Sequence, residues 1–159
     1  MLLGLFAALA VIIIDQISKY YVMADLLSGR GIIMVTDYFN IVRAWNTGVS
    51  FSMFNDMGSA GIVILSLVAA AIVGGLLVWL YKEKSRALQL ALGMIIGGAV
   101  GNVIDRVRLG AVFDFLDFHV AGSHWPAFNA ADSFICIGAA IIIVHSMIYH
   151  KNEKKAEEK

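Results

Sequence analysis

The sequence predicts an all-α membrane protein of four transmembrane helices, with a small β-cradle outside the membrane. Hydrophobic residues make up 60% of its 159 positions and charged residues only 15%, whereas a soluble domain is about half apolar and about a quarter charged. Long uncharged runs follow one another along the chain, which has a mean hydropathy of +0.80 and a single proline. We therefore expect one integral-membrane domain, 1–159, with the bilayer as its solvent.

Four apolar segments account for the predicted helices, because about 20 residues of helix cross the roughly 30 Å of bilayer hydrocarbon. The segments are 1–23, in which an uncharged run to Ile14 continues past Asp15, then 57–81, 87–104, and a last one that begins near Asn129 and ends at 149. The first segment has no basic start and no small-residue cleavage site, so we expect a retained helix and not a cleaved signal peptide.

The distribution of charge predicts the orientation of these helices. The linker 82–86 and the tail after His150 are rich in Lys and Arg, and such loops usually stay in the cytoplasm. With four spans, both chain ends are then cytoplasmic. All four Glu lie in the linker and the tail, while all eight Asp lie at the other ends of the helices or in the outer loops. The Asp residues therefore gather on the extracytoplasmic side.

The first outer loop, about 24–56, carries the pattern of a small sheet. The β-branched runs IIMV and YFNIV flank the turn signal Thr36-Asp37, and Val49, Phe51 and Met53 alternate with smaller residues. Such runs predict short strands. The second outer loop, about 107–127, ends in Trp125-Pro126, an interfacial aromatic before a helix start.

Charged and amide side chains collect at the outer helix ends. Asp15 and Lys19 are one helical turn apart in the favourable order, which predicts a structural polar clamp or, alternatively, a snorkelling interfacial pair. Ionisable groups at membrane depth usually face the bundle interior or water. Three polar neighbours share one face of the third helix, and the last two are ionisable: Asn102, Asp105 and Arg106. An Arg106–carboxylate pair would keep both groups charged.

Glycines on a neighbouring stripe permit close helix packing: Gly93, Gly97 and Gly101.

Two acids come together in the second outer loop and at the start of the last helix. Asn129 suits an N-cap and Asp132 the first turn, so plain capping is the simple alternative for that pair. Capping does not account for Asp114, which stands among apolar neighbours in VFDF. Two close carboxylates supply one base for a water molecule and one acid for a carbonyl oxygen, as in aspartic proteases. Asp117, three residues after Asp114, could instead be a solvated loop acid, and its role stays open.

Other chemistries have weaker support. His119 and His124 flank the outer loop without a metal-binding HExxH spacing, and no GxSxG nucleophile motif occurs. The zero net charge gives no indication of nucleic-acid binding, and Cys136, the single cysteine, is expected to be a buried apolar residue. Two other functions stay open. A proton-coupled transporter would place its acids near the bilayer midplane and often show internal repeats, and a non-enzymatic scaffold would need the acids only as caps.

Five sequence blocks, in order along nearly the whole chain, resemble the bacterial lipoprotein signal peptidases, signal peptidase II. They are DQISK from Asp15, NTGVSF from Asn46, GGAVGNVIDR from Gly97, VFDF from Val112 and FNAAD from Phe128. One departure is visible, because Val49 and Ser50 stand where many family members carry two alanines. Both are small, so altered packing or substrate preference is expected and not lost activity.

The resemblance implies a metal-free aspartic endopeptidase, without other cofactors, in the bacterial cytoplasmic (inner) membrane. It would cut prolipoproteins just before a diacylglyceryl-modified cysteine, with Asp114 and Asp132 as the catalytic dyad on the extracytoplasmic side. Its partners would be prolipoproteins, membrane lipids and globomycin-type inhibitors. The resemblance assigns substrate binding or site support to Asn46, Gly48, Asn102, Arg106 and Asn129. It assigns structural polar support to Asp15, Lys19 and Asp105.

Overall fold

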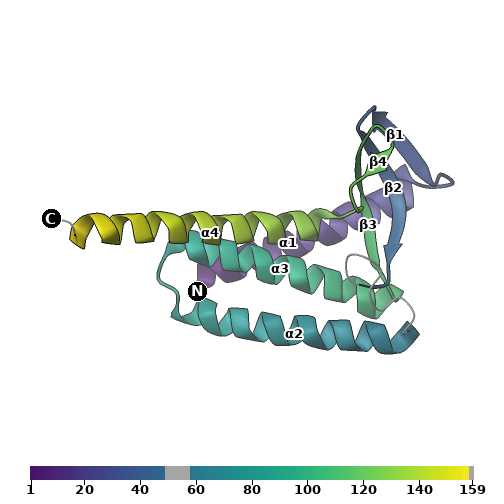
Figure 1. Cartoon of the computed structure of the whole chain (residues 1–159). Helices are drawn as coiled ribbons and strands as arrows, with labels where there is room; N and C mark the ends of the chain where they lie inside the picture. The colour runs from purple at the N-terminus through teal and green to yellow at the C-terminus, as the bar shows by residue number, and fades with distance from the viewer. Residues whose placement is uncertain (49–57, 158–159) are drawn as a thin grey trace.

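Four long helices form the body of the protein in a computed structural model that describes residues 1–48 and 58–157. They are α1 (Leu2–Tyr21), α2 (Gly58–Lys82), α3 (Arg86–Leu109) and α4 (Ala130–Glu157). Each contains a stretch long and apolar enough to cross a membrane, and the four stretches coincide with the predicted segments. Figure 1 shows the chain's two ends at one end of the bundle and a small sheet at the other.

Helix α3 lies at the centre of the bundle, between α2 and α4 in Figure 1, and its glycines let α1 and α4 approach it. A Cβ on Gly97 would come within 2.5 Å of the Ala8 carbonyl oxygen, and one on Gly98 within 2.5 Å of the Ala131 carbonyl oxygen. A side chain at either position would therefore push a neighbouring helix away. The predicted packing role of the glycine stripe is confirmed.

The sheet is antiparallel, in the order β1-β2-β3-β4. Its strands are β1 (Ile32–Thr36), β2 (Phe39–Asn46), β3 (Val112–Val120) and β4 (Ser123–His124). The predicted strands on either side of Thr36-Asp37 are confirmed, whereas the predicted alternation at Val49, Phe51 and Met53, like the Val49-Ser50 departure, lies outside the described residues. Strand β3 was not predicted: its residues were expected to form a loop, but six of them pair with β2.

Two local features attach the sheet to the bundle and shape its far end. Helix α1 continues as the π-helical turn η1 (Val22–Leu26), and Val22 and Leu27 pack against Phe113 and Phe115 of β3. Strands β3 and β4 are joined by Ala121 and Gly122, with φ of 49° and 81°. Positive φ at both central residues suits the twist of a two-residue hairpin, which brings β4 back along β3.

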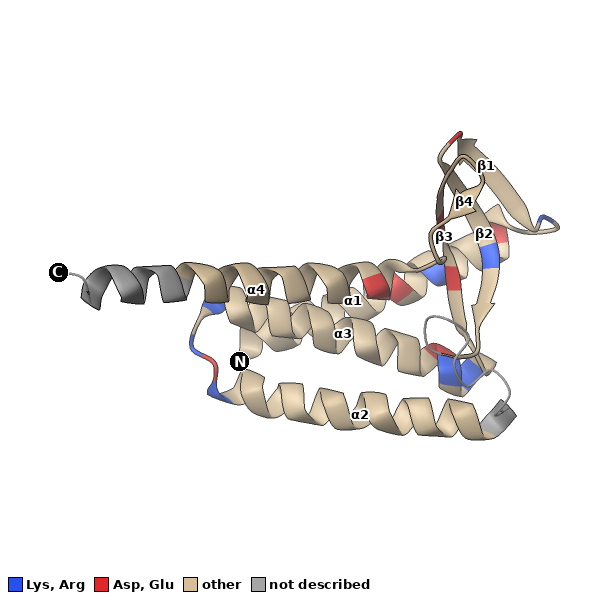
Figure 2. Ribbon diagram, viewed as in Figure 1, with Lys and Arg blue, Asp and Glu red and all other residues tan. Residues whose placement is uncertain are grey.

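The charged residues are distributed as expected for helices that cross a membrane. Figure 2 shows Lys, Arg, Asp and Glu at the two ends of the bundle, in the α2–α3 linker and beside the sheet, with none on the described helices between them. The expectation that Cys136 is buried was wrong, because this residue is exposed on the surface of α4. An apolar residue in a transmembrane helix can face lipid as readily as protein, so hydrophobicity does not predict burial there.

Candidate active site

A buried ion network joins α1 to α3 just below the sheet. The Lys19 ammonium lies 2.8 Å from a carboxylate oxygen of Asp15 and 2.8 Å from one of Asp105, and all three side chains are at most 4% exposed. Lys19 also donates to Oδ1 of Asn102 at 3.1 Å. The predicted Asp15–Lys19 pair is confirmed as a clamp inside the protein, and the snorkelling alternative is wrong. A buried charge of this kind is stable only while its partners remain in place.

The carboxylates of this network also bind the two chain segments that carry the candidate dyad. Asp15 accepts a hydrogen bond of 3.0 Å from the backbone N–H of Ala131, beside Asp132. Asp105 accepts one of 3.2 Å from the backbone N–H of Phe113, beside Asp114. Each bond holds the backbone one residue away from a candidate catalytic carboxylate, so the network positions both.

Gln16 belongs to this network, although the sequence reasoning did not select it. Its amide donates to Oδ1 of Asp105 at 2.9 Å and to the Gly101 carbonyl at 3.3 Å. The only signal for this residue was its place beside Asp15 in the DQISK block. Its partners are more than eighty residues away in the sequence, so helical spacing alone gave no reason to choose it.

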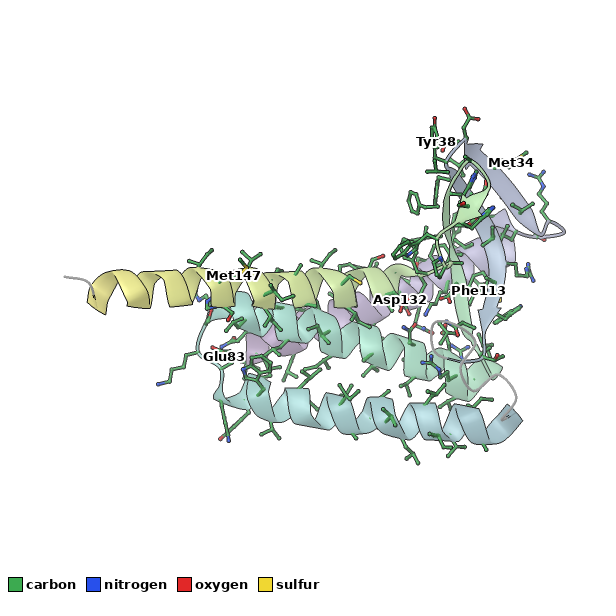
Figure 3. The ribbon with its side chains drawn as sticks, in the orientation of Figure 1. Met34, Tyr38, Glu83, Phe113, Asp132 and Met147 are labelled. Atoms are coloured by element: carbon green, nitrogen blue, oxygen red, sulfur yellow. The ribbon has the colours of Figure 1, made fainter. Side chains whose placement is uncertain are left out.

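Asn129 touches both candidate carboxylates. Its side-chain amide donates to Oδ1 of Asp114 at 2.7 Å, and its backbone N–H donates to Oδ2 of Asp132 at 3.2 Å. Its own Oδ1 accepts from the backbone N–H of Asp132 at 3.0 Å, which is the predicted N-cap of α4. Asn102 completes the arrangement by donating to Oδ1 of Asp132 at 2.8 Å and accepting from Asn129 at 3.1 Å. Figure 3 shows Asp132 where α4 meets the sheet.

The carboxyl group of Asp114 binds its proton more tightly than an ordinary aspartate does. Asp114 is only 2% exposed. This burial, together with the negative charge of Asp132, raises the pKa of Asp114 to about 7. Hydrogen bonds from Asn46, at 3.2 Å, and from Asn129 act in the opposite direction without cancelling the effect. A carboxyl group with this pKa can hold a proton near neutral pH.

Arg106 and Gly48 meet at the edge of this cluster. The guanidinium donates to the Gly48 carbonyl at 3.3 Å, and the Gly48 N–H donates to the Asn46 side chain at 3.2 Å. Sequence reasoning expected an Arg106–carboxylate pair that could fix a loop. The hydrogen bond found for Arg106 reaches a backbone carbonyl just beyond β2. The negative charges of three carboxylates act on the same guanidinium: Asp132, Asp114 and Asp105.

Asp117, whose role the sequence left open, lies elsewhere on β3, and the alternative of a solvated loop acid is wrong. The residue is 6% exposed. Its carboxylate accepts from the Asn40 amide at 2.9 Å and lies 2.8 Å from Nδ1 of His124. Burial acts to raise the pKa of Asp117, but these hydrogen bonds outweigh it, and the pKa falls below its ordinary value. Asp117 therefore belongs to the far end of the sheet and is no member of the candidate dyad.

The arrangement has the features of an aspartic site. Across residues 1–48 and 58–157, the structure contains no group of three or more His, Cys, Asp or Glu side chains that could hold a metal ion. Two carboxylates share an asparagine, one of them with its pKa near neutrality, at one end of four membrane-length helices. These features are those of a class, the membrane proteins that carry a pair of neighbouring carboxyl groups as aspartic-type enzymes do.

Comparison with known proteins gives the family. Residues 7–148 match the family model described as signal peptidase (SPase) II. A lipoprotein signal peptidase of Aeromonas hydrophila subsp. hydrophila is 43% identical over 96% of this chain and 91% of its own length. One from Anaplasma phagocytophilum is 39% identical over 89% and 90%. The chain belongs to the signal peptidase II family and is an aspartic-type signal peptidase.

Solved structures agree with this assignment. One, described as a bacterial membrane enzyme, superimposes with a TM-score of 0.80 at 28% identity, covering 94% of this chain and 90% of its own. A second with the same description gives a TM-score of 0.75 at 29% identity, covering 89% and 90%. The protein is thus a multi-pass membrane enzyme, and none of these similarities supports the transporter alternative.

Proposed function

We propose that the protein removes signal peptides from prolipoproteins by cutting the peptide bond just before a diacylglyceryl-modified cysteine. The observation that carries the proposal is the hydrogen bonding of Asn129 to both Asp114 and Asp132. These residues come from a strand and from a helix start eighteen positions further along the chain. The names of the relatives, lipoprotein signal peptidases, indicate the substrate class.

In the proposed mechanism, Asp132 acts as the base and Asp114 as the acid. Two N–H groups donate to Asp132, which suits a carboxylate that takes a proton from the attacking water. Asp114, with a pKa of about 7, carries a proton and donates it to the carbonyl oxygen as the water oxygen bonds to the carbonyl carbon. The tetrahedral intermediate then collapses. One of its hydroxyl groups returns a proton to Asp114 as the carbonyl re-forms, the C–N bond breaks, and the proton held by Asp132 passes to the leaving amino group of the cysteine.

The remaining polar residues support this pair in the proposal. Asn102 and Asn129 orient the carboxylates, Asn46 and Arg106 with Gly48 bound the site on the β2 side, and the network of Asp15, Lys19 and Asp105 supports the backbone from below. This division follows the hydrogen bonds described above. The reaction itself uses only water and the two carboxyl groups, with no metal or other cofactor.

The setting of the site suits a lipid-modified substrate. The basic α2–α3 linker favours a cytoplasmic position for that end of the bundle, so the site faces the extracytoplasmic side of the bacterial inner membrane. A signal peptide is an apolar helix, and a diacylglyceryl group lies among the lipids of the outer leaflet. Lateral diffusion would bring both to the helix ends, where water is available. Globomycin-type inhibitors are expected to compete for the same site.

The test is cleavage of a diacylglyceryl prolipoprotein in detergent by Asp114→Asn and Asp132→Asn, with Asp25→Asn as the control. Asp25 is an exposed acid of η1 outside the site, so its replacement should leave the rate unchanged. Each dyad variant should fold and lose cleavage. Processing by either variant at near the wild-type rate would refute the assignment. EDTA should have no effect on the wild type, and loss of activity that zinc restores would contradict a metal-free mechanism.

A further inference from the structure

The face of the sheet that carries Asp114 continues to the far end of β3. On β2, Asn46 donates to Asp114 and Asn40 donates to Asp117, and the β2–β3 pairing shifts register between these two contacts, at Ile41 and Ala44. Asp114 and Asp117 are three apart, but the backbone N–H groups of Phe115 and Leu116 both donate to the Phe128 carbonyl. This is the pattern of a β-bulge, which lets both acids point to the same side.

A pocket of about 610 Å³ opens at that far end. Strand β1 contributes Ile32 and Met34 to its walls, and the other strands and turns contribute Asp37, Asn40, His119 and His124. We call it the Asn40 pocket. No Lys or Arg is found among the described residues that line it, and Asp37 contributes an exposed carboxylate.

Two residues that line the Asn40 pocket each have a buried side-chain atom with no partner among the described residues. The atoms are Oδ1 of Asn40, a residue only 4% exposed, and Nε2 of His119. A carbonyl oxygen can only accept a hydrogen bond, and a neutral imidazole nitrogen can accept one as well. Leaving such atoms unpaired costs about 1–3 kcal/mol each. The pocket therefore suits a ligand that brings N–H donors.

We propose that the Asn40 pocket binds a lysine side chain of the prolipoprotein, in the mature segment that follows the modified cysteine. An ammonium group supplies three donors and a positive charge, which match Asn40, His119 and Asp37. Its methylene stem suits the apolar walls at Ile32 and Met34. The inference rests on the proposed function, since it assigns a specificity site to the same enzyme.

Geometry sets the position of that lysine. His119 is five residues beyond Asp114 on β3, and a strand rises about 3.3 Å per residue, so the two are about 16 Å apart along the strand. An extended substrate covers this distance in about five residues. The pocket therefore selects at positions about four to six after the cysteine.

The experiment measures kcat/KM for diacylglyceryl prolipoproteins that carry Lys, Leu or Glu at each of these positions in turn. The wild type should favour Lys over Glu by about three- to tenfold at one position, mainly through KM, because a partly exposed ion pair with hydrogen bonds has this magnitude. Asp37→Asn and His119→Ala should each reduce the preference. Asp25→Asn, an equivalent change outside the pocket, should keep it.

Equal kcat/KM for Lys, Leu and Glu at every tested position would overturn the inference, as would a preference that Asp37→Asn and His119→Ala leave intact. Either outcome leaves the proposed function standing, because all of these substrates would still be cut. Failure of the proposed function would show differently: Asp114→Asn or Asp132→Asn would still cleave. The Leu substrates separate charge from size, since a purely steric pocket would treat Leu and Lys alike.

Discussion

Replacing Asp114 with Asn should abolish cleavage and, at neutral or alkaline pH, stabilise the folded protein. The wild-type carboxyl group has a pKa of about 7 in place of the ordinary 3.8, because it is buried and faces the charge of Asp132. At about 1.36 kcal/mol per pKa unit, ionised Asp114 costs the folded state about 4 kcal/mol. An asparagine of similar shape has no charge to bury, so it removes this cost.

The gain should be smaller than the full cost. Asn129 can still donate to the new carbonyl oxygen, but the Asn46 amide would face either that oxygen or a second NH₂ group. An unmatched donor there would cost about 1–2 kcal/mol. The expected net stabilisation above pH 7 is therefore about 2–3 kcal/mol, or roughly 5–10 °C in Tm for a chain of this size.

The pH dependence identifies the cause. Below the unfolded-state pKa of 3.8 the carboxyl group is protonated in both states, so it contributes no cost. Between 3.8 and about 7 the unfolded chain ionises first, and wild-type stability falls relative to the variant. Above pH 7 the difference is constant. The assay is thermal unfolding in detergent at several pH values, with Asp25→Asn as control. A variant that is less stable than wild type by the same margin at every pH would refute the reasoning.

Three further predictions follow from the site and the helix packing. Wild-type kcat/KM should fall as pH rises through about 7, because Asp114 loses the proton it donates, and a profile flat to pH 9 would contradict its role as acid. Lys19→Met leaves two buried carboxylates without their counter-charge and should cost about 3–5 kcal/mol in thermal unfolding, whereas a loss below 1 kcal/mol would count against a tightly coupled network. Gly98→Leu should abolish the folded protein in size-exclusion chromatography, because α4 lies against that position, while Gly75→Leu, with open space around it, should be tolerated. Equal yields from the two glycine variants would refute the packing account.

The sequence predicted the membrane helices well because their main requirement is local. About 20 apolar residues in succession satisfy the bilayer, and the backbone satisfies its own hydrogen bonds within each helix. The turn at Thr36-Asp37 and the cap at Asn129 are local as well, so both were predicted correctly. Cys136 was placed wrongly since the side of a transmembrane helix that faces lipid is chosen by packing and not by hydrophobicity.

The missed features depend on contacts between distant parts of the chain. Strand β3 needs β2, which lies about seventy residues earlier, and Asp117 is buried because Asn40 of that strand, 77 residues away, donates to it. Gln16 joins the site through a residue 89 positions away. None of these partners can be found by helical or strand periodicity, because period and spacing describe only one element at a time.

By itself, the sequence determined the solvent of this protein, the number and approximate limits of its membrane helices and the residue types available at the helix ends beside the sheet. Runs of apolar residues and the pattern of the five blocks contain that information directly. Only the tertiary structure decided how the two acids that the resemblance names, Asp114 and Asp132, are brought together. Asp114 and Asp132 converge because Asn129 binds both and a buried network around Lys19 holds the backbone beside each. Asp117, on the same strand and with the same carboxyl group, is directed instead to Asn40 and His124, because a bulge and the register of β2 fix where its side chain lies.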